Sequence, residues 1–206
     1  MAAVAESGFV HHVEAPRTAA PRRALLLLHG TGGNEHDLVP LGRAVAPDAV
    51  LISPRGAVLE NGMPRFFRRF AEGVFDEADV IARAAELAAW AKAMAARHAP
   101  GLPLATLGFS NGANIAAALM LLHPEVLDEA VLLRAMPPLS QPPRPDLAGR
   151  RVLLLNGLAD PIAPPSHANH LASLLREAGA SVEARTIPAG HGLTQPDLDA
   201  AAAFFR

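Results

Sequence analysis

The sequence contains no cysteine among its 206 residues. Disulfide bonds, a cysteine nucleophile and thiolate metal ligands are therefore excluded. An excess of one charge is also missing, because 18 lysines and arginines stand against 20 aspartates and glutamates, which gives a net charge of −2. Binding to nucleic acid or to a membrane surface needs a concentrated positive field, so we expect neither partner.

Long apolar runs are lacking as well. The longest aliphatic run near the N-terminus covers residues 24–28, far below the roughly 20 residues that cross a bilayer. Residues 1–10 have no basic segment followed by an apolar one, so they do not predict a signal peptide. We therefore expect no stable membrane association and a cytoplasmic location.

What is present is a globular composition, with 50% apolar and 18% charged residues, in a length that suits one domain over residues 1–206. Short apolar stretches alternate with longer helix-like ones, which predicts an α/β fold with a mostly parallel, doubly wound sheet flanked by helices. The predicted strands are 9–13, 24–28, 50–53, 104–109, 130–133, 152–156 and 182–187. The predicted helices are 35–46 (with Asn34 as N-cap), 76–98, 111–123, 166–178 and 196–204. Two segments rich in proline or glycine, 53–73 and 136–149, are predicted loops.

The strongest chemical motif is GFSNG at residues 108–112. It fits the pattern G-x-S-x-G, follows an apolar strand and precedes an alanine-rich helix. This context is typical of the nucleophile elbow of α/β-hydrolases, in which flanking glycines let strand and helix approach closely. We therefore interpret Ser110 as a nucleophile.

A serine hydroxyl needs a base and an acid, which in this fold follow it in the order acid, histidine. His191 lies between two glycines just after the last predicted strand, where a loop can deliver its ring. The other downstream histidines, His123, His167 and His170, lie at or within predicted helices, and their spacing predicts no metal site. Asp160, in the loop after strand 152–156, is the preferred acid, because its competitor Asp146 precedes that strand.

An oxyanion hole needs two backbone N–H groups aimed at the developing charge. The residue after the nucleophile, Asn111, is one candidate donor. Thr31 is the other, because it lies in the glycine-rich loop 29–33 that follows strand 24–28.

Four segments together resemble one known family: residues 28–38, 108–112, 157–161 and 190–193. They are similar to the bacterial phospholipase/carboxylesterase family, which includes the acyl-protein thioesterases. The resemblance implies an α/β-hydrolase fold without a large cap domain, an ester or thioester substrate, no cofactor and often a homodimer. The segment 53–69 resembles the carboxylesterase branch, and that resemblance favours a small-molecule ester.

The same segment offers candidate pocket residues. Met63, Phe66, Phe67 and Phe70, together with Met136, form an apolar acyl or alcohol pocket in one interpretation and ordinary core in the other. Three arginines, at positions 65, 68 and 69, either pair with the glutamates at 60 and 72 or hold a carboxylate of the substrate, for which the guanidinium fork is suited. Arg68 is included among the pocket candidates.

Three functions remain open from the sequence. A serine carboxylesterase acting on small or short-acyl esters through an acyl-enzyme is favoured. An acyl-protein thioesterase or lysophospholipase-like hydrolase is the alternative. A non-catalytic binding protein on a hydrolase scaffold is disfavoured by the complete set of Ser, Asp and His.

Overall fold

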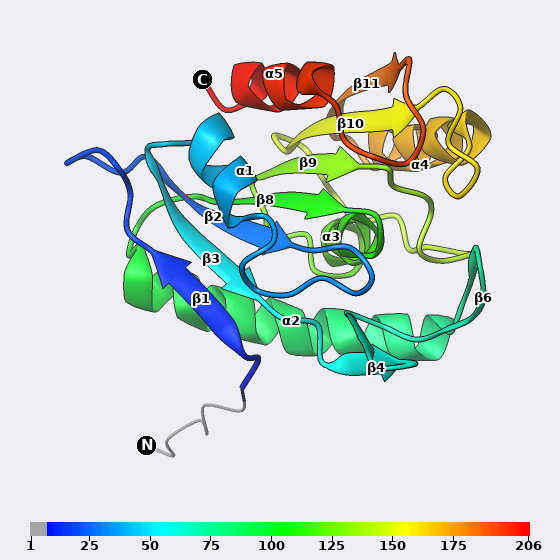
Figure 1. Cartoon of the computed structure of the whole chain (residues 1–206), viewed down its shortest axis with the longest axis horizontal. Coiled ribbons are helices and arrows are strands. Elements are labelled where there is room, and N and C mark those ends of the chain that lie inside the picture. Colours follow the sequence, from blue (N-terminus) through cyan, green and yellow to red (C-terminus); the bar gives the residue numbers. More distant parts are fainter. Residues whose placement is uncertain (1–7) are drawn as a thin grey trace.

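The computed structural model describes residues 8–206, so most of the N-terminal stretch that does not predict a signal peptide lies outside the described residues. A seven-stranded sheet forms the centre, in the order β1-β3-β2-β8-β9-β10-β11 (Figure 1). Only β1 runs antiparallel to its neighbour, and the other five pairings are parallel. The strands are β1 (His11–Glu14), β2 (Arg23–Leu28), β3 (Ala49–Pro54), β8 (Leu104–Phe109), β9 (Glu129–Leu133), β10 (Arg151–Gly157) and β11 (Ser181–Ile187).

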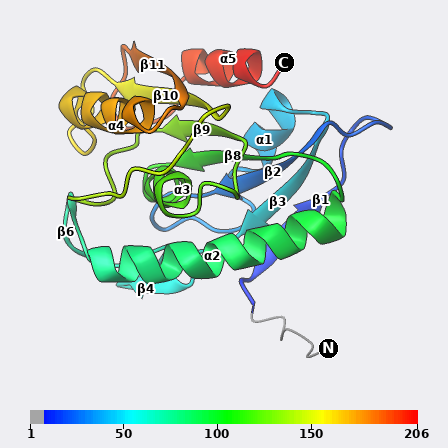
Figure 2. The same cartoon turned by 180° about the vertical axis from the view of Figure 1, so that it is seen from behind.

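Five helices cover both faces of this sheet (Figures 1 and 2). One core packs under α2 (Glu77–His98), α3 (Asn111–Leu122) and α4 (Pro165–Glu177), and the other packs under α1 (Val39–Val45) and α5 (Gln195–Phe204). Strand β2 is buried throughout and feeds both cores, with Leu26 on one side and Leu27 on the other. A strand buried on both faces explains its continuous run of leucines. The doubly wound α/β-hydrolase architecture is thus confirmed.

The order of the strands indicates where a binding site would lie on this sheet. From β2 the chain moves outward to β3, then crosses back and places β8 on the other side of β2. In open α/β sheets, ligands bind beyond the carboxyl ends of strands at such a reversal. The loops after β2 and β8, which carry Thr31 and Ser110, leave the sheet at this point.

The prediction for helix 35–46 is wrong at its start. The helix begins at Val39, with Pro40 in its first turn, and Asn34 does not cap it. The Asn34 side chain instead accepts a hydrogen bond from the His36 N–H at 2.8 Å. Asparagine stabilises a turn of this kind locally, and proline in the first helical turn needs no N–H partner.

The predicted loop 53–73 contains two small hairpins, a second correction. β4 (Val58–Glu60) pairs with β5 (Met63–Arg65), and β6 (Arg69–Ala71) pairs with β7 (Val74–Phe75). The first turns at Asn61 and Gly62, both with positive φ, a sequence that favours tight hairpins. The predicted loop 136–149 is irregular, as expected. Within residues 8–206, no helix is long and apolar enough to cross a membrane.

Candidate active site

Ser110 lies on a sharp turn between β8 and α3. Its φ of 53° and ψ of −116° are strained for a residue with a side chain. The flanking glycines are a steric requirement: a Cβ on Gly112 would lie 1.9 Å from the Leu28 carbonyl oxygen, and one on Gly108 would lie 2.6 Å from the Gly112 oxygen. The geometry is that of a nucleophile elbow.

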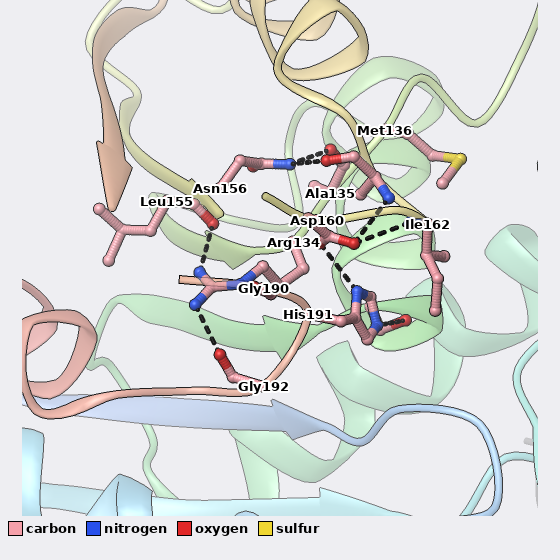
Figure 3. Close-up of polar contacts among 12 residues, drawn as sticks. Arg134, Ala135, Met136, Leu155, Asn156, Asp160, Ile162, Gly190, His191 and Gly192 are labelled. Carbon is pink, nitrogen blue, oxygen red and sulfur yellow. Dashed lines mark hydrogen bonds and ion pairs between the residues drawn. The ribbon is translucent and has the colours of Figure 1, made fainter. Parts of the chain in front are cut away.

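The structure brings Ser110, His191 and Asp160 into one hydrogen-bonded chain. His191 Nε2 lies 3.0 Å from Ser110 Oγ, and His191 Nδ1 lies 2.8 Å from Asp160 Oδ2. Figure 3 shows the imidazole of His191 directed at Asp160 across the ends of the strands. Three segments far apart in sequence meet here, as the sequence predicts.

Asp160 is fixed on both carboxylate oxygens. Its Oδ1 accepts N–H groups from Ile162 at 2.8 Å and Ala163 at 3.1 Å, which leaves Oδ2 for His191. Burial by itself would raise the pKa of Asp160, but the hydrogen bonds from Ala163, His191 and Ile162 outweigh burial and lower it. The ionised carboxylate accepts the Nδ1 proton, so Nε2 presents its lone pair to Ser110.

Thr31 and Asn111 are held by one neighbouring segment. Arg65 Nη1 donates to Thr31 Oγ1 at 2.5 Å, and the Phe66 N–H donates to Asn111 Oδ1 at 2.7 Å. The next N–H of the loop, that of Gly32, donates to the carbonyl of Pro64 at 2.9 Å. β5 and the residue after it therefore fix both candidate oxyanion donors relative to Ser110.

His29 is a structural determinant of the site that sequence reasoning missed. It is buried, its Nδ1–H donates to the Gly30 carbonyl at 2.6 Å, and its Nε2 accepts the Gly56 N–H at 2.9 Å. Loss of hydration in this position lowers the pKa of His29, so the ring is neutral and bridges the loops after β2 and β3. The sequence signal that could have identified His29 is its position directly after a buried strand and before Gly30.

The loop after β2 also contains Glu35, which forms a pH-dependent ion pair with Arg55. Two hydrogen bonds from Arg55, at 2.6 and 2.8 Å, lower the pKa of Glu35 to about 2 from its ordinary 4.5. The folded state thus gains stability from ionised Glu35 above about pH 4.5 and loses it as the pH falls toward 2. We expect Glu35→Gln to reduce the free energy of unfolding at pH 6 by roughly 1–3 kcal/mol, allowing for the exposure of Arg55.

Urea unfolding of wild type and Glu35→Gln at pH 6 and pH 3 checks this, with the exposed Glu86→Gln as control. The stability gap between wild type and Glu35→Gln should narrow at pH 3. A gap of equal size at both pH values would show that the ionisation of Glu35 contributes nothing.

A cavity of about 260 Å³ opens at Ser110 and His191. Of the five apolar residues predicted for the pocket, only Met136 lines it. Phe66 and Phe67 are instead buried in the core that also contains residues of α2 and α3. Met63 on β5 is 40% exposed, and Phe70 on β6 is more exposed still.

Four residues of the cavity wall were not predicted from the sequence: Phe75, Phe109, Asn114 and Ile162.

The three clustered arginines have different positions relative to the cavity. Arg68 is not among the residues that line the cavity and pairs with Asp76 at 2.9 Å, so its inclusion among the pocket residues is not supported. Arg65 and Arg69 do line the cavity. Arg69 pairs with Glu60 at 2.8 Å and with Glu72 at 2.5 Å, which matches the ion-pair interpretation. Arg65 also lies 3.2 Å from Glu60, so the two arginines of the cavity wall are matched in charge by Glu60 and Glu72.

A parallel sheet of this order with a serine at the β8–α3 elbow defines an α/β-hydrolase. The phospholipase/carboxylesterase family matches residues 10–206, and the chain belongs to that family of hydrolases. MhqD of Bacillus subtilis (strain 168), which carries a provisional assignment as a hydrolase, is 46% identical over 184 residues, covering 88% of this chain and 92% of MhqD.

Solved structures agree. The Bacillus cereus carboxylesterase is 40% identical with a TM-score of 0.90, over 97% of this chain and 94% of that one. A carboxylesterase from Mesorhizobium loti is 41% identical with a TM-score of 0.83, over 89% of this chain and 88% of that one. The chain is thus similar to carboxylesterases across nearly its whole length.

Proposed function

We propose that this protein is a serine carboxylesterase that hydrolyses small, uncharged carboxylic esters through an acyl-enzyme. The observation that carries the proposal is the unbroken chain from Ser110 Oγ through His191 to the buried carboxylate of Asp160, at 3.0 and 2.8 Å, beside an open cavity. Membership of a phospholipase/carboxylesterase family supports the same reaction class.

In the acylation half-reaction, the Ser110 oxygen attacks the ester carbonyl carbon while His191 Nε2 takes the hydroxyl proton. The Asp160 carboxylate accepts the hydrogen bond from His191 Nδ1–H and stabilises the imidazolium. Negative charge develops on the former carbonyl oxygen, and the backbone N–H groups of Thr31 and Asn111 stabilise it. Asn111 is the first residue of α3, so the positive end of the helix adds to this effect.

The tetrahedral intermediate then breaks at the bond to the alcohol oxygen. The alcohol leaves with the proton from His191, and the acyl group stays on Ser110. In the second half-reaction a water molecule gives its proton to His191 Nε2 and attacks the acyl carbon. Collapse of this intermediate returns the proton to Ser110 and releases the carboxylic acid.

The cavity dimensions bear on substrate size. The cavity at Ser110 is about 260 Å³, below the roughly 300–1,000 Å³ that drug-sized ligands occupy. A second cavity of about 310 Å³ shares Phe75 and Met136 with the first and extends along residues 137–140. Short acyl and alcohol groups fit the first cavity, and larger ones must pass Met136.

Truncation of Met136 tests this account of size selection. We expect Met136→Ala to raise kcat/KM for hexanoate and octanoate esters relative to acetate by roughly 10-fold, because a larger passage favours apolar groups by about a kcal/mol or more. Met94→Ala, an identical change in a buried methionine of α2 remote from the cavity, is the control. An unchanged ratio of long to short esters in Met136→Ala would remove Met136 from substrate selection.

Hydrolysis of p-nitrophenyl esters from acetate to palmitate tests the proposed function, with a palmitoylated peptide thioester measured in parallel. The account predicts fast turnover of short esters and a steep fall with chain length. Turnover of the thioester and of long chains alone would favour the thioesterase alternative. No turnover of any ester by the folded protein would favour a binding protein.

A further inference from the structure

Arg134 is the most unusual charged residue outside the site. It directly follows β9, has a left-handed φ of 59°, and its side chain is completely buried. Two hydrogen bonds of 2.7 and 2.8 Å join its guanidinium to Asp197, which is equally buried. A strained backbone and a fully buried cation are both costly, so the position calls for an explanation.

The remaining N–H groups of Arg134 reach the loop that carries His191. Nε donates to the Gly190 carbonyl at 3.1 Å, and Nη2 donates to the Gly192 carbonyl at 2.8 Å. These two carbonyls flank His191 on either side. Figure 3 shows the guanidinium between the end of β10 and the loop, with Gly190, His191 and Gly192 around it. Nη1 also donates to the Leu155 carbonyl of β10 at 3.2 Å, which ties the loop to the sheet.

Asp197 fixes the other end of the same loop. It is the third residue of α5, and its carboxylate accepts both the N–H and the hydroxyl of Thr194 at 2.8 Å; the bond from the Thr194 N–H is one half of a capping box. Between Ile187 of β11 and Gln195 of α5 the chain is irregular. A backbone bond holds the loop at Ala189, whose carbonyl accepts the Ala159 N–H at 3.0 Å. Beyond Ala189, Arg134 and Asp197 together provide bonds just before His191, just after it and at the start of α5.

We propose that Arg134 is a positioning residue for His191, acting by holding the carbonyls of Gly190 and Gly192 so that the imidazole reaches both Ser110 and Asp160. The inference rests on the proposed function, because it assumes that His191 is the base. Displacement of a catalytic group by about 1 Å costs on the order of 10²-fold in rate. Arg134 itself touches no reacting atom, so substrate affinity should change little.

The test is the double variant Arg134→Met/Asp197→Asn, in which no buried charge is left unpaired. We expect kcat to fall on the order of 10²-fold with KM changed by less than about 3-fold. Arg134→Lys should fall between this variant and wild type, because an ammonium donates to fewer carbonyls than a guanidinium. Circular dichroism and a thermal melt confirm that each variant is folded at the assay temperature.

Arg23→Met is the matched control. Arg23 is also a buried arginine and pairs with Glu129 at 2.9 Å. Arg23 is the first residue of β2 and Glu129 the first of β9, so this pair lies at the amino ends of the strands, opposite the site. We expect the Arg23→Met variant to be less stable than wild type but to have an unchanged kcat. A kcat of Arg134→Met/Asp197→Asn equal to that of Arg23→Met would overturn the positioning role and leave only a structural ion pair.

A second readout does not depend on turnover. The proton between His191 Nδ1 and Asp160 gives a downfield proton NMR signal, identified by its absence in His191→Gln. We expect this signal to be lost or broadened in Arg134→Met/Asp197→Asn and kept in Arg23→Met; a sharp, unshifted signal would overturn the proposal. Activity that survives in Ser110→Ala would instead overturn the proposed function.

Discussion

Replacement of Ser110 by alanine should lower kcat by roughly 10⁶-fold, with the protein still folded. The reason is the position of the Ser110 hydroxyl at the turn between β8 and α3. Ser110 Oγ lies 3.0 Å from His191 Nε2, and its removal takes away the atom that would form the acyl-enzyme. Residual rate would come only from the N–H groups of Thr31 and Asn111 and from substrate binding.

The measurement is hydrolysis of p-nitrophenyl acetate by wild type and Ser110→Ala at equal concentrations. Ser173→Ala, at an exposed serine of α4, is the control for the same atomic change elsewhere. It should keep wild-type kcat. Activity in Ser110→Ala within 10-fold of wild type would move the nucleophile to another residue.

Asp160→Asn should lower kcat by about 10⁴-fold. The two N–H groups of Ile162 and Ala163 require an oxygen at the Oδ1 position, so the new amide must place its NH₂ group at the Oδ2 position, facing His191. The imidazole must then accept at Nδ1 and carry its proton on Nε2. In this tautomer the ring cannot take the Ser110 proton.

Asp146→Asn is the matched control, because Asp146 is the other aspartate considered as the acid and is exposed, with its carboxylate accepting only a local N–H in the contacts seen for residues 8–206. It should retain wild-type kcat/KM. Equal loss in the two variants, or no loss in Asp160→Asn, would place the acid elsewhere.

Much of the fold and the three central residues follow from local signals. Continuous aliphatic runs such as residues 24–28 predict buried parallel strands, and each of the seven predicted strands is found in the sheet. Ser110 lies in the G-x-S-x-G motif, Asp160 follows the predicted strand 152–156, and His191 follows the predicted strand 182–187. Parallel strands bring their carboxyl ends to one edge, so residues just beyond them meet without any knowledge of side-chain packing.

The pocket could not be predicted in the same way. Phe66 and Phe67 are adjacent in sequence to cavity residues, but the two hairpins between β3 and α2 turn them into the core and bring Phe75 to the cavity. The dipeptide at Asn61 was a readable signal for the first hairpin. Arg134 carried none, because its role depends on a buried partner, Asp197, that is 63 residues away.

The central claim is that Ser110 is an activated nucleophile. The most direct test is treatment of the folded protein with a fluorophosphonate, which forms a stable ester with an activated serine, followed by mass spectrometry of its peptides. The account predicts a single adduct on the peptide that contains Ser110, with labelling lost in Ser110→Ala and strongly slowed in His191→Ala. An adduct on another residue, or no adduct on an active protein, would contradict it.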